Sequence, residues 1–227
     1  MKIVRFSQKG LVGYWRFDEQ TGSTAKDSSP YGNDGTIYGA TRVRGIIGKA
    51  LSFDGVDDYV EVSKIWNYNY TILGWAKPLT TGIQSRHLIE SFASSSPTTG
   101  DGYLIQLWDD DYIYFYQAVD GNFYAVTTKY PFPHDGKFHQ FGMRFTFDGT
   151  TAKLEGILDG EIIASRNTTG TPNEPAVTYT RIAHNNFNGI IDEVRIYNKA
   201  LSPGEIKIIY AFTKYIKPHP IIMRRKL

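Results

Sequence analysis

The sequence contains no cysteine, and only 3 of its 227 residues are methionine. Without thiols the chain cannot form disulfides, thiolate zinc sites or a cysteine nucleophile, so disulfide-stapled scaffolds and cysteine hydrolases are excluded. The sequence also lacks an apolar run near the roughly 18 residues that a membrane-spanning helix needs. Its first residues, MKIVRFSQ, do not contain the apolar segment of a secretory signal. We therefore expect no membrane insertion.

The sequence also lacks a large excess of positive or negative residues. The 25 Lys and Arg residues nearly balance the 23 Asp and Glu residues, which leaves a net charge of +2. Basic residues are scattered, apart from Arg224, Arg225 and Lys226 close to the end of the sequence. A near-neutral chain does not generate the positive field that attracts phosphate backbones. We therefore expect no nucleic-acid partner.

Glycine and aromatic residues are abundant instead, with 22 Gly, 16 Tyr and 13 Phe. Aromatic and β-branched residues favour strands, and turn pairs such as Asp54-Gly55, Asp120-Gly121 and Asp159-Gly160 separate the apolar segments. This pattern predicts an all-β fold, an antiparallel β-sandwich. The expected strands are residues 11–17, 50–53, 59–62, 70–77, 88–92, 103–108, 112–117, 123–128, 138–147, 152–158, 161–166 and 189–197.

The length suits one large all-β domain, since a chain of this size buries about 70% of its unfolded surface or more without staples. We expect residues 1–213 to form this domain and residues 214–227, with two prolines and the basic end, to form a tail. One short helix is predicted near the end of the domain. Ser202 and Glu205 make a capping box around Pro203, and an apolar stripe follows.

Three ordered segments carry a resemblance to a known family: GLVGYWRFDE, GKALSFDGVDDYVEV and FNGIIDEVRIYNKALSPGEI. Together they resemble the laminin-G-like jelly-roll domains of the concanavalin A-like lectin/glucanase superfamily, and the resemblance extends from about Gly10 to Phe212. It implies a jelly-roll sandwich. If the strand at 11–17 pairs with the strand at 190–197, the two ends of the domain close one sheet and reduce its exposed edge.

The resemblance also implies a structural calcium ion. Calcium takes six to eight oxygen ligands at about 2.3 to 2.6 Å, and acidic residues at strand ends and turns supply such oxygens. We expect Asp18 and Asp192 as ligands, because the terminal strands would bring them together, with Asn33 and Asp54 as weaker candidates. In the alternative, Asp192 and its neighbour Glu193 pair with arginines or accept backbone hydrogen bonds.

A hairpin at residues 103–117 (YLIQLWDDDYIYFYQ) carries the candidate ligand surface. Alternation places three tyrosines on one face, and Ile113 and Phe115 on the other. If Ile113 and Phe115 face the core, the tyrosines line the outer face, and tyrosine and tryptophan rings with polar edges suit sugar rings. Structural packing or a protein interface is the alternative, because aromatic cross-strand pairs also stabilise sheets. The expected ligand-binding residues are Trp108, Tyr112, Tyr114, Tyr116, Gln106 and Arg86.

No catalytic pair is evident. A retaining glycosidase needs two carboxyl groups about 5 to 5.5 Å apart, but Asp192 and Glu193 are adjacent and face opposite sides of a strand, and Glu90 stands alone in LIESF. The five histidines lack a zinc spacing such as HExxH, so we interpret them as structural, with His139 in the packing. We expect no enzymatic activity.

The sequence therefore favours a non-catalytic module that recognises a carbohydrate or glycoconjugate in surface adhesion, with calcium as a structural ion. The alternative is a structural or assembly protein, such as a capsid, surface or adhesion subunit, that uses the sandwich for contacts with other protein subunits. A glycoside hydrolase is the minor alternative. These functions suggest an extracellular, cell-surface or virion-associated chain, although no signal peptide is visible.

Overall fold

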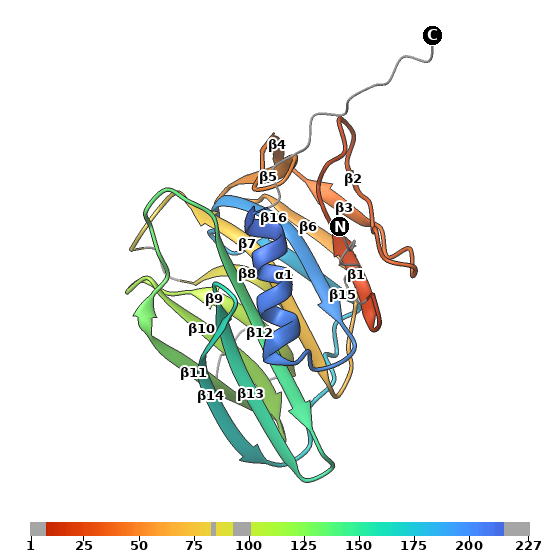
Figure 1. The fold of residues 1–227 in the computed structure, drawn as a ribbon, viewed down its shortest axis with the longest axis vertical. Helices are drawn as coiled ribbons and strands as arrows, with labels where there is room; N and C mark the ends of the chain where they lie inside the picture. Colours follow the sequence, from red (N-terminus) through yellow and green to blue (C-terminus); the bar gives the residue numbers. More distant parts are fainter. Residues whose placement is uncertain (1–7, 83–84, 93–100, 216–227) are drawn as a thin grey trace.

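The computed structural model describes residues 8–82, 85–92 and 101–215. Its described strands form two eight-stranded antiparallel sheets, and one helix lies on the outer side of one sheet (Figure 1). Sheet A has the order β14-β13-β12-β7-β16-β5-β4, with β1 paired to β16. Its strands are β1 (Leu11–Trp15), β4 (Thr41–Arg44), β5 (Lys49–Asp54), β7 (Tyr70–Pro78), β12 (His139–Phe147), β13 (Thr151–Leu158), β14 (Glu161–Thr169) and β16 (Asn188–Tyr197).

Sheet B carries the hairpin with the candidate ligand surface. Its order is β11-β10-β9-β8-β15-β6-β3-β2. Its strands are β2 (Thr24–Ala25), β3 (Gly35–Tyr38), β6 (Tyr59–Ser63), β8 (Arg86–Phe92), β9 (Gly102–Leu107), β10 (Tyr112–Val119), β11 (Asn122–Pro131) and β15 (Tyr179–His184).

Every strand expected from the sequence is present, and no end differs by more than three residues. The sandwich is therefore confirmed. The sequence did not predict β2, β3, β4 and β15. The first three have two to four residues each, and three of the six residues of β15 are polar. It is a strand because it pairs with β6 on one side and β8 on the other, both far away in the sequence.

The two ends of the described chain meet in sheet A, as expected. Strand β1 pairs antiparallel with β16, with Leu11 opposite Tyr197 and Trp15 opposite Val194. Trp15 and Val194 are fully buried in the core between the sheets. The pairing therefore joins sequence segments about 180 residues apart and contributes to the core as well as to the ladder.

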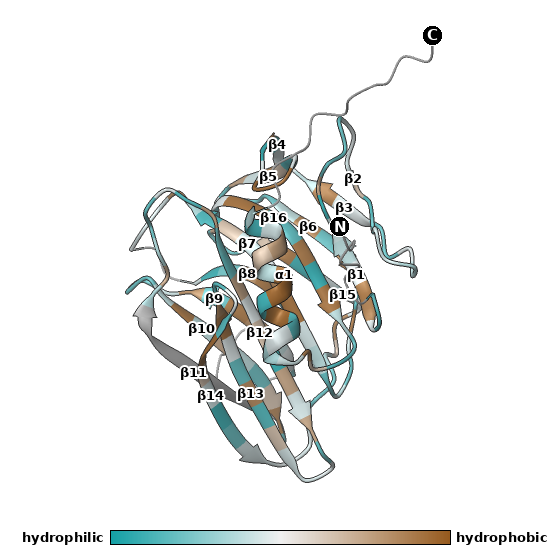
Figure 2. Ribbon diagram, in the orientation of Figure 1, coloured by the Kyte–Doolittle hydropathy of each residue, from teal (hydrophilic) through white to brown (hydrophobic). Residues whose placement is uncertain are grey.

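Strand alternation builds the core between the sheets. Along β10, Ile113 and Phe115 are buried in it, while the alternate residues Tyr112, Tyr114 and Tyr116 are half-buried on the outer face. Gly156 of β13 faces Phe115 across the sandwich, and a Cβ on Gly156 would lie 2.3 Å from the Phe115 ring. Figure 2 shows the same alternation of hydrophobic and hydrophilic residues along β13.

The helix α1 (Pro203–Tyr215) begins where the capping box predicts. The Ser202 backbone N–H donates to Oε2 of Glu205 at 2.7 Å, and the Glu205 backbone N–H donates to Oγ of Ser202 at 3.2 Å. The helix extends two residues past the expected end of the domain at 213. The remainder of the expected tail, residues 216–227, lies outside the described residues. Among those described, no helix has the length and apolar character to cross a bilayer.

One apolar face of α1 packs on the outer side of sheet A. Ile206 and Ile209 are buried in a cluster that includes Leu73 of β7. The Tyr210 ring stacks on Trp75 of the same strand, with centroids 5.3 Å apart and planes 8° apart. The helix thus covers sheet A, whereas the aromatic hairpin lies in sheet B (Figure 1).

Candidate functional site

A row of aromatic side chains lies on the outer face of sheet B. This aromatic row consists of Trp108, Tyr112, Tyr114 and Tyr116, all half-buried. The rings of Tyr114 and Tyr116 are nearly parallel, with centroids 6.3 Å apart and planes 13° apart, and Trp108 lies 6.4 Å from Tyr114. The structure therefore brings together three of the expected aromatic residues, Trp108, Tyr114 and Tyr116, on the outer face.

Hydrogen bonds hold the phenol groups of the row. The Tyr114 hydroxyl donates to Oδ2 of Asp110 at 3.0 Å, and Nε2 of Gln106 donates to the Tyr116 hydroxyl at 3.1 Å. Burial, with help from the Asp110 carboxylate, raises the pKa of Tyr114 to about 12, and burial raises the pKa of Tyr116. Both phenols therefore keep their protons at neutral pH. Gln106 is 2% exposed, so it positions Tyr116 rather than presenting an open amide.

Arg86 does not fit the expected role of hydrogen-bond donor to a ligand. Its side chain has no exposed surface. The guanidinium donates to the carbonyl oxygens of Thr80 at 2.6 Å and Trp108 at 2.8 Å, and it forms an ion pair with Asp111. A buried guanidinium is retained with its charge paired and its donors bonded. Arg86 therefore fixes the hairpin from within instead of reaching its surface.

A second aromatic group lies on sheet B, and the sequence analysis missed it. Tyr38 of β3 stacks on Tyr59 of β6 with centroids 4.5 Å apart. Arg181 of β15 lies over the rings of Tyr59 and Tyr179, 4.9 and 4.2 Å from their centroids, and its Nε lies 3.1 Å from Oε2 of Glu61. The group depends on pairing among β3, β6 and β15, two of which were not predicted as strands.

Beside the second aromatic group, on the paired strands β8 and β15, two histidines meet one carboxylate. Nδ1 of His87 lies 2.5 Å from Oε2 of Glu90, and Nδ1 of His184 lies 2.7 Å from Oε1. We call these three residues the His–Glu cluster. Burial would raise the pKa of Glu90, but the two imidazoles outweigh it and hold the pKa at about 2. The carboxylate therefore stays charged.

A β-bulge creates the His–Glu cluster. Residues three apart on a regular strand face opposite sides of a sheet. In β8 the register shifts between His87 and Ile89, so that Leu88 and Ile89 both enter the core while His87 and Glu90 face outward together. The same pairing of β8 with β15 sets His184 opposite His87. The sequence analysis interpreted these histidines as structural and did not predict that two of them meet at Glu90, because no local spacing indicates the bulge.

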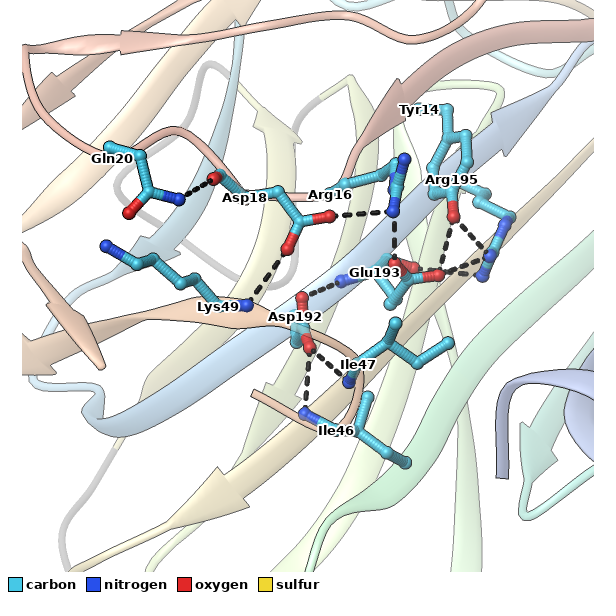
Figure 3. A network of polar contacts seen from close by, with 10 residues as sticks. All are labelled: Tyr14, Arg16, Asp18, Gln20, Ile46, Ile47, Lys49, Asp192, Glu193 and Arg195. Atoms are coloured by element: carbon cyan, nitrogen blue, oxygen red, sulfur yellow. Dashed lines mark hydrogen bonds and ion pairs between the residues drawn. The ribbon is translucent and has the colours of Figure 1, made fainter. Parts of the chain in front are cut away.

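The expected calcium ligands Asp18 and Asp192 contact one loop, residues 45–49, and we call this arrangement the terminal seam (Figure 3). Oδ1 of Asp18 accepts from the Lys49 backbone N–H at 2.9 Å, and Oδ2 of Asp192 accepts from Ile46 at 2.9 Å and Ile47 at 3.3 Å. Burial, together with repulsion from the neighbouring Glu193, raises the pKa of Asp192 to about 8.

Glycines let the loop approach both carboxylates. A Cβ on Gly45 would lie 2.3 Å from Oδ2 of Asp192, and a Cβ on Gly48 would lie 2.0 Å from Oδ1 of Asp18. Gly48 also has φ of +63°, which favours glycine.

Two carboxylates from opposite ends of the domain thus share a loop, and their oxygens already have partners. Oδ1 of Asp192 accepts from the Glu193 backbone N–H at 2.8 Å, and Oδ2 of Asp18 pairs with Arg16 at 2.7 Å. The alternative of backbone hydrogen bonds therefore holds for Asp192, and a calcium ion would have to displace these donors to use the same oxygens.

The two weaker calcium candidates lie elsewhere. The Asn33 side-chain amide donates to the Val12 carbonyl at 2.8 Å. Asp54 is paired with Asn188 in the ladder between β5 and β16, four residues along β16 from Asp192. Asp54 instead joins Asp57 and Asp58 in an exposed acidic turn. The structure therefore does not bring the four expected ligands together.

The arginine pairing considered as an alternative holds for Glu193. Its Oε2 forms an ion pair with Arg195, and it accepts from the Tyr14 hydroxyl at 2.6 Å. Nε of Arg16 lies 3.9 Å from its Oε1 (Figure 3). Glu193 also has φ of +54°, at the point where β16 shifts its register against β7. The bulge turns Asp192 toward the loop and Glu193 toward the arginines.

Comparisons with known proteins agree with this architecture. The model of one laminin-G-like family, described as "Concanavalin A-like lectin/glucanases superfamily", matches residues 54–207. No curated protein matches the chain in sequence.

Several solved structures share the fold. Domain 4 of the arabinanase AbnA from Geobacillus stearothermophilus, in complex with arabinotriose, is 20% identical with a TM-score of 0.65, and the match covers 88% of this chain and 98% of that one. The binding domain of Paraclostridial Mosquitocidal Protein 1 is 18% identical with a TM-score of 0.67, covering 89% and 52%. The binding domain of botulinum neurotoxin DC, in complex with SialylT, is 14% identical with a TM-score of 0.68, covering 92% and 52%.

At these identities the structures establish the fold alone, and this chain spans about half the length of the two toxin chains. The family model, in contrast, matches the sequence itself over more than half of the chain. The chain therefore belongs to the concanavalin A-like lectin/glucanases superfamily.

Proposed function

We propose that this domain recognises a carbohydrate through the aromatic row on the outer face of sheet B. The observation that carries the proposal is the near-parallel pair Tyr114 and Tyr116 with Trp108 beside it, half-buried and edged by hydrogen-bonding groups. Sugar rings present flat C–H patches to aromatic faces and hydroxyls to polar groups, and tyrosine and tryptophan offer both. A glycan carried on a cell or particle would make the domain an adhesion module.

Two of the similar structures support the carbohydrate class. The arabinanase domain was determined with arabinotriose and the botulinum toxin domain with SialylT. Each belongs to a protein whose fold resembles this chain at low identity, so they favour sugars as a class without naming the one bound here. We also propose that the domain binds without cleaving.

Calorimetry after a glycan-array screen tests the proposal. Trp108→Ala and Tyr114→Ala each remove one stacking ring, and we expect at least about a tenfold loss of affinity, equal to roughly 1.4 kcal/mol. Tyr31→Ala is the matched control, because Tyr31 is 61% exposed in the β2–β3 turn, outside the row. Absence of any glycan ligand, or equal affinity of the Trp108 and Tyr114 variants and the wild type, refutes the proposal. Release of reducing sugar on incubation with the ligand would refute the non-catalytic part.

For the terminal seam we propose a structural calcium ion held by Asp18 and Asp192. The seam joins β1, β5 and β16, so an ion there would tie the two ends of the domain to one loop. A ligand bound only by the folded state at 100 times its Kd stabilises it by about 2.7 kcal/mol, which is roughly 5 to 10 °C for a chain of this size. We expect calcium to raise the unfolding temperature by this amount relative to chelator. We also expect Asp192→Asn to remove the difference, while equal unfolding temperatures for the wild type in calcium and chelator would exclude the ion.

Assembly is a second candidate function, and one feature of α1 favours it. Ile208, Phe212 and Tyr215 are 51%, 39% and 71% exposed and follow one another at helical spacing. Phe212 is at the flank of α1, where it lines a cavity with Tyr14 and Tyr197 of sheet A. Exposed apolar stripes commonly mark protein contacts. The occupant we propose is a second copy of this chain. Light scattering would then give a dimer that Ile208→Asp dissociates, and a wild-type monomer at micromolar concentration would exclude it.

A further inference from the structure

The His–Glu cluster places three metal-binding groups around one point. The ligand atoms of His87, Glu90 and His184 all lie within 4.8 Å of one another. Ligands at about 2.0 to 2.1 Å from a tetrahedral Zn²⁺ are roughly 3.4 Å apart. The three atoms therefore need only small side-chain shifts to share one ion, and they come from two paired strands rather than from a loop.

The hydrogen bonds of His87 leave Nδ1 as the nitrogen that would bind a metal ion. Its Nε2 lies 2.9 Å from Oγ of Ser85, which itself donates to Oε1 of Gln106. With the Ser85 proton used in this way, His87 must donate through Nε2–H. The side-chain Nδ2 of Asn185 lies 3.3 Å from Nδ1 of His87 and can donate to it. The contact of Nδ1 with Oε2 of Glu90 at 2.5 Å is a hydrogen bond when Nδ1 carries a proton. A bound metal ion would replace that proton and leave the tautomer in which only Nε2 is protonated.

That tautomer needs a positive charge in the cluster. An Nδ1 lone pair 2.5 Å from a charged carboxylate oxygen is repulsive unless a proton or a metal ion lies between them. A metal ligand of this kind characteristically donates its other ring N–H to a neighbouring acceptor, which fixes the ring. Ser85 is that acceptor for His87. Ser85 in turn donates to Gln106, and Gln106 donates to the hydroxyl of Tyr116, so hydrogen bonds connect the cluster to the aromatic row.

His184 is the third metal-binding residue of the His–Glu cluster and the one nearest to solvent. Its Nδ1 is buried and makes no hydrogen bond of good geometry, although Oε1 of Glu90 is 2.7 Å away. Nε2 lies 3.5 Å from Nη1 of Arg181, at the limit of a hydrogen bond, and Arg181 is also paired with Glu61. Arginine can only donate, so in this contact Nε2 is the acceptor. With a metal on Nδ1, Nε2 would carry the ring proton, and Arg181 would turn from it and keep Glu61 as its partner.

Burial and backbone conformation both indicate a constructed site. His87 and Glu90 are each 5% exposed, whereas the His184 side chain is 27% exposed, which leaves one side open to a water molecule. Ala183 and Asn185, on either side of His184, have φ of +55° and +43°, and Ser85 has φ of +55°. Such conformations are unfavourable for residues with a Cβ and concentrate at functional sites.

We propose that the His–Glu cluster binds one Zn²⁺ ion through Nδ1 of His87, Nδ1 of His184 and a Glu90 oxygen, with water in the fourth position. Two imidazoles and one carboxylate are a borderline N/O donor set that suits zinc. Calcium instead requires oxygen ligands throughout. The site is thus distinct in chemistry from the terminal seam, and it does not depend on the glycan proposal.

Calorimetric titration of the full chain with ZnCl₂ after EDTA treatment and dialysis tests this site. We expect one Zn²⁺ per chain, and binding that persists in excess Ca²⁺. Co²⁺ as a spectroscopic substitute should give the visible absorption of a four-coordinate complex. His184→Ala and Glu90→Gln should each weaken Zn²⁺ binding at least about tenfold. Circular dichroism in EDTA checks that each variant is folded. If Glu90→Gln does not fold, His184→Ala still tests the site, because the His184 side chain is partly exposed and its loss disturbs the core less.

His139→Ala is the matched control. His139 also contacts two carboxylates, but its Nδ1 faces Asp159 at 2.7 Å while its Nε2 faces Asp135 at 3.1 Å. One ion cannot bind through both nitrogens of one ring, so this variant should bind Zn²⁺ like the wild type. A wild type without stoichiometric Zn²⁺, or a loss in His139→Ala equal to that in His184→Ala, would overturn the proposal.

Discussion

Histidine shows at the scale of single residues how partners decide a role. His139 was expected in the packing, and its ring does pack edge-on against Phe132, with centroids 6.1 Å apart. It also bridges Asp135 and Asp159 through its two nitrogens. His87 instead meets a hydroxyl on one nitrogen and a carboxylate on the other. The residue type is the same, but in the second arrangement a second imidazole, that of His184, contacts the same carboxylate.

His139 gives a pH prediction. The Asp159 hydrogen bond, with Asp135 beside it, raises the pKa of His139, while partial burial opposes this rise. A raised pKa means that the folded state holds the proton more tightly. The resulting stability is fully present below the unfolded pKa of about 6.5 and is lost as pH rises through the folded pKa. His139→Gln should therefore cost more at about pH 5 than at about pH 9, by a few tenths to about 1 kcal/mol.

Urea unfolding of the wild type and His139→Gln at both pH values measures this difference. Lys137→Gln, an exposed change next to Asp135, serves as a control for surface charge. A cost for His139→Gln that is the same at both pH values would show that the ring contributes through packing alone.

At the scale of elements, the alternation of apolar and polar residues correctly assigned the two faces of β10. It placed Ile113 and Phe115 in the core and the tyrosines outside, because that strand is regular. In β8 the alternation fails at the bulge after His87, and Glu90 appears on the opposite face from the one that counting predicts. The aromatic row was therefore predictable, whereas the His–Glu cluster was not.

The helix cap provides a prediction at this scale. Ser202→Ala removes the oxygen that accepts from the Glu205 backbone N–H and leaves that donor without its side-chain partner. We expect a loss of about 1 kcal/mol in the free energy of unfolding. Ser202→Asp should retain most of the stability, because a carboxylate also caps and interacts favourably with the helix dipole. Chemical denaturation measures both, and an Ala variant as stable as the wild type would contradict the role of the cap.

At the scale of the whole molecule, the close approach of the two sheets limits the size of the side chains that fit between them. Gly156 of sheet A lies against Phe115 of sheet B with no room for a side chain. Gly156→Ala should force the ring or the sheets to shift and cost about 1 to 3 kcal/mol. Gly204→Ala is the matched control, because a Cβ there meets nothing within 4 Å, and in a helix it should stabilise by about 0.5 to 1 kcal/mol. Thermal unfolding compares them, and no loss in Gly156→Ala would mean that the interface is loosely packed.

Closure by the terminal strands was also predictable at this scale, because the motifs around Trp15 and Val194 indicated that the two ends pair. The partners of individual polar residues were not.

The sequence analysis assigned Arg86 as a hydrogen-bond donor to a ligand. In the structure its guanidinium is buried and contacts two backbone carbonyls and the Asp111 carboxylate. The sequence analysis proposed Asp54 as a weaker calcium ligand. The register of the ladder between β5 and β16 instead pairs Asp54 with Asn188, four residues away from Asp192 along β16.

The sequence by itself determined the sandwich, the faces of regular strands such as β10 and the helix cap, because these depend on alternation and on contacts between residues close together in the chain. The tertiary structure alone decided that His184 meets His87 and Glu90, and that Asp18 and Asp192 share a loop. These meetings depend on strand register and on two bulges, and one extra residue in a strand moves every following side chain to the other face.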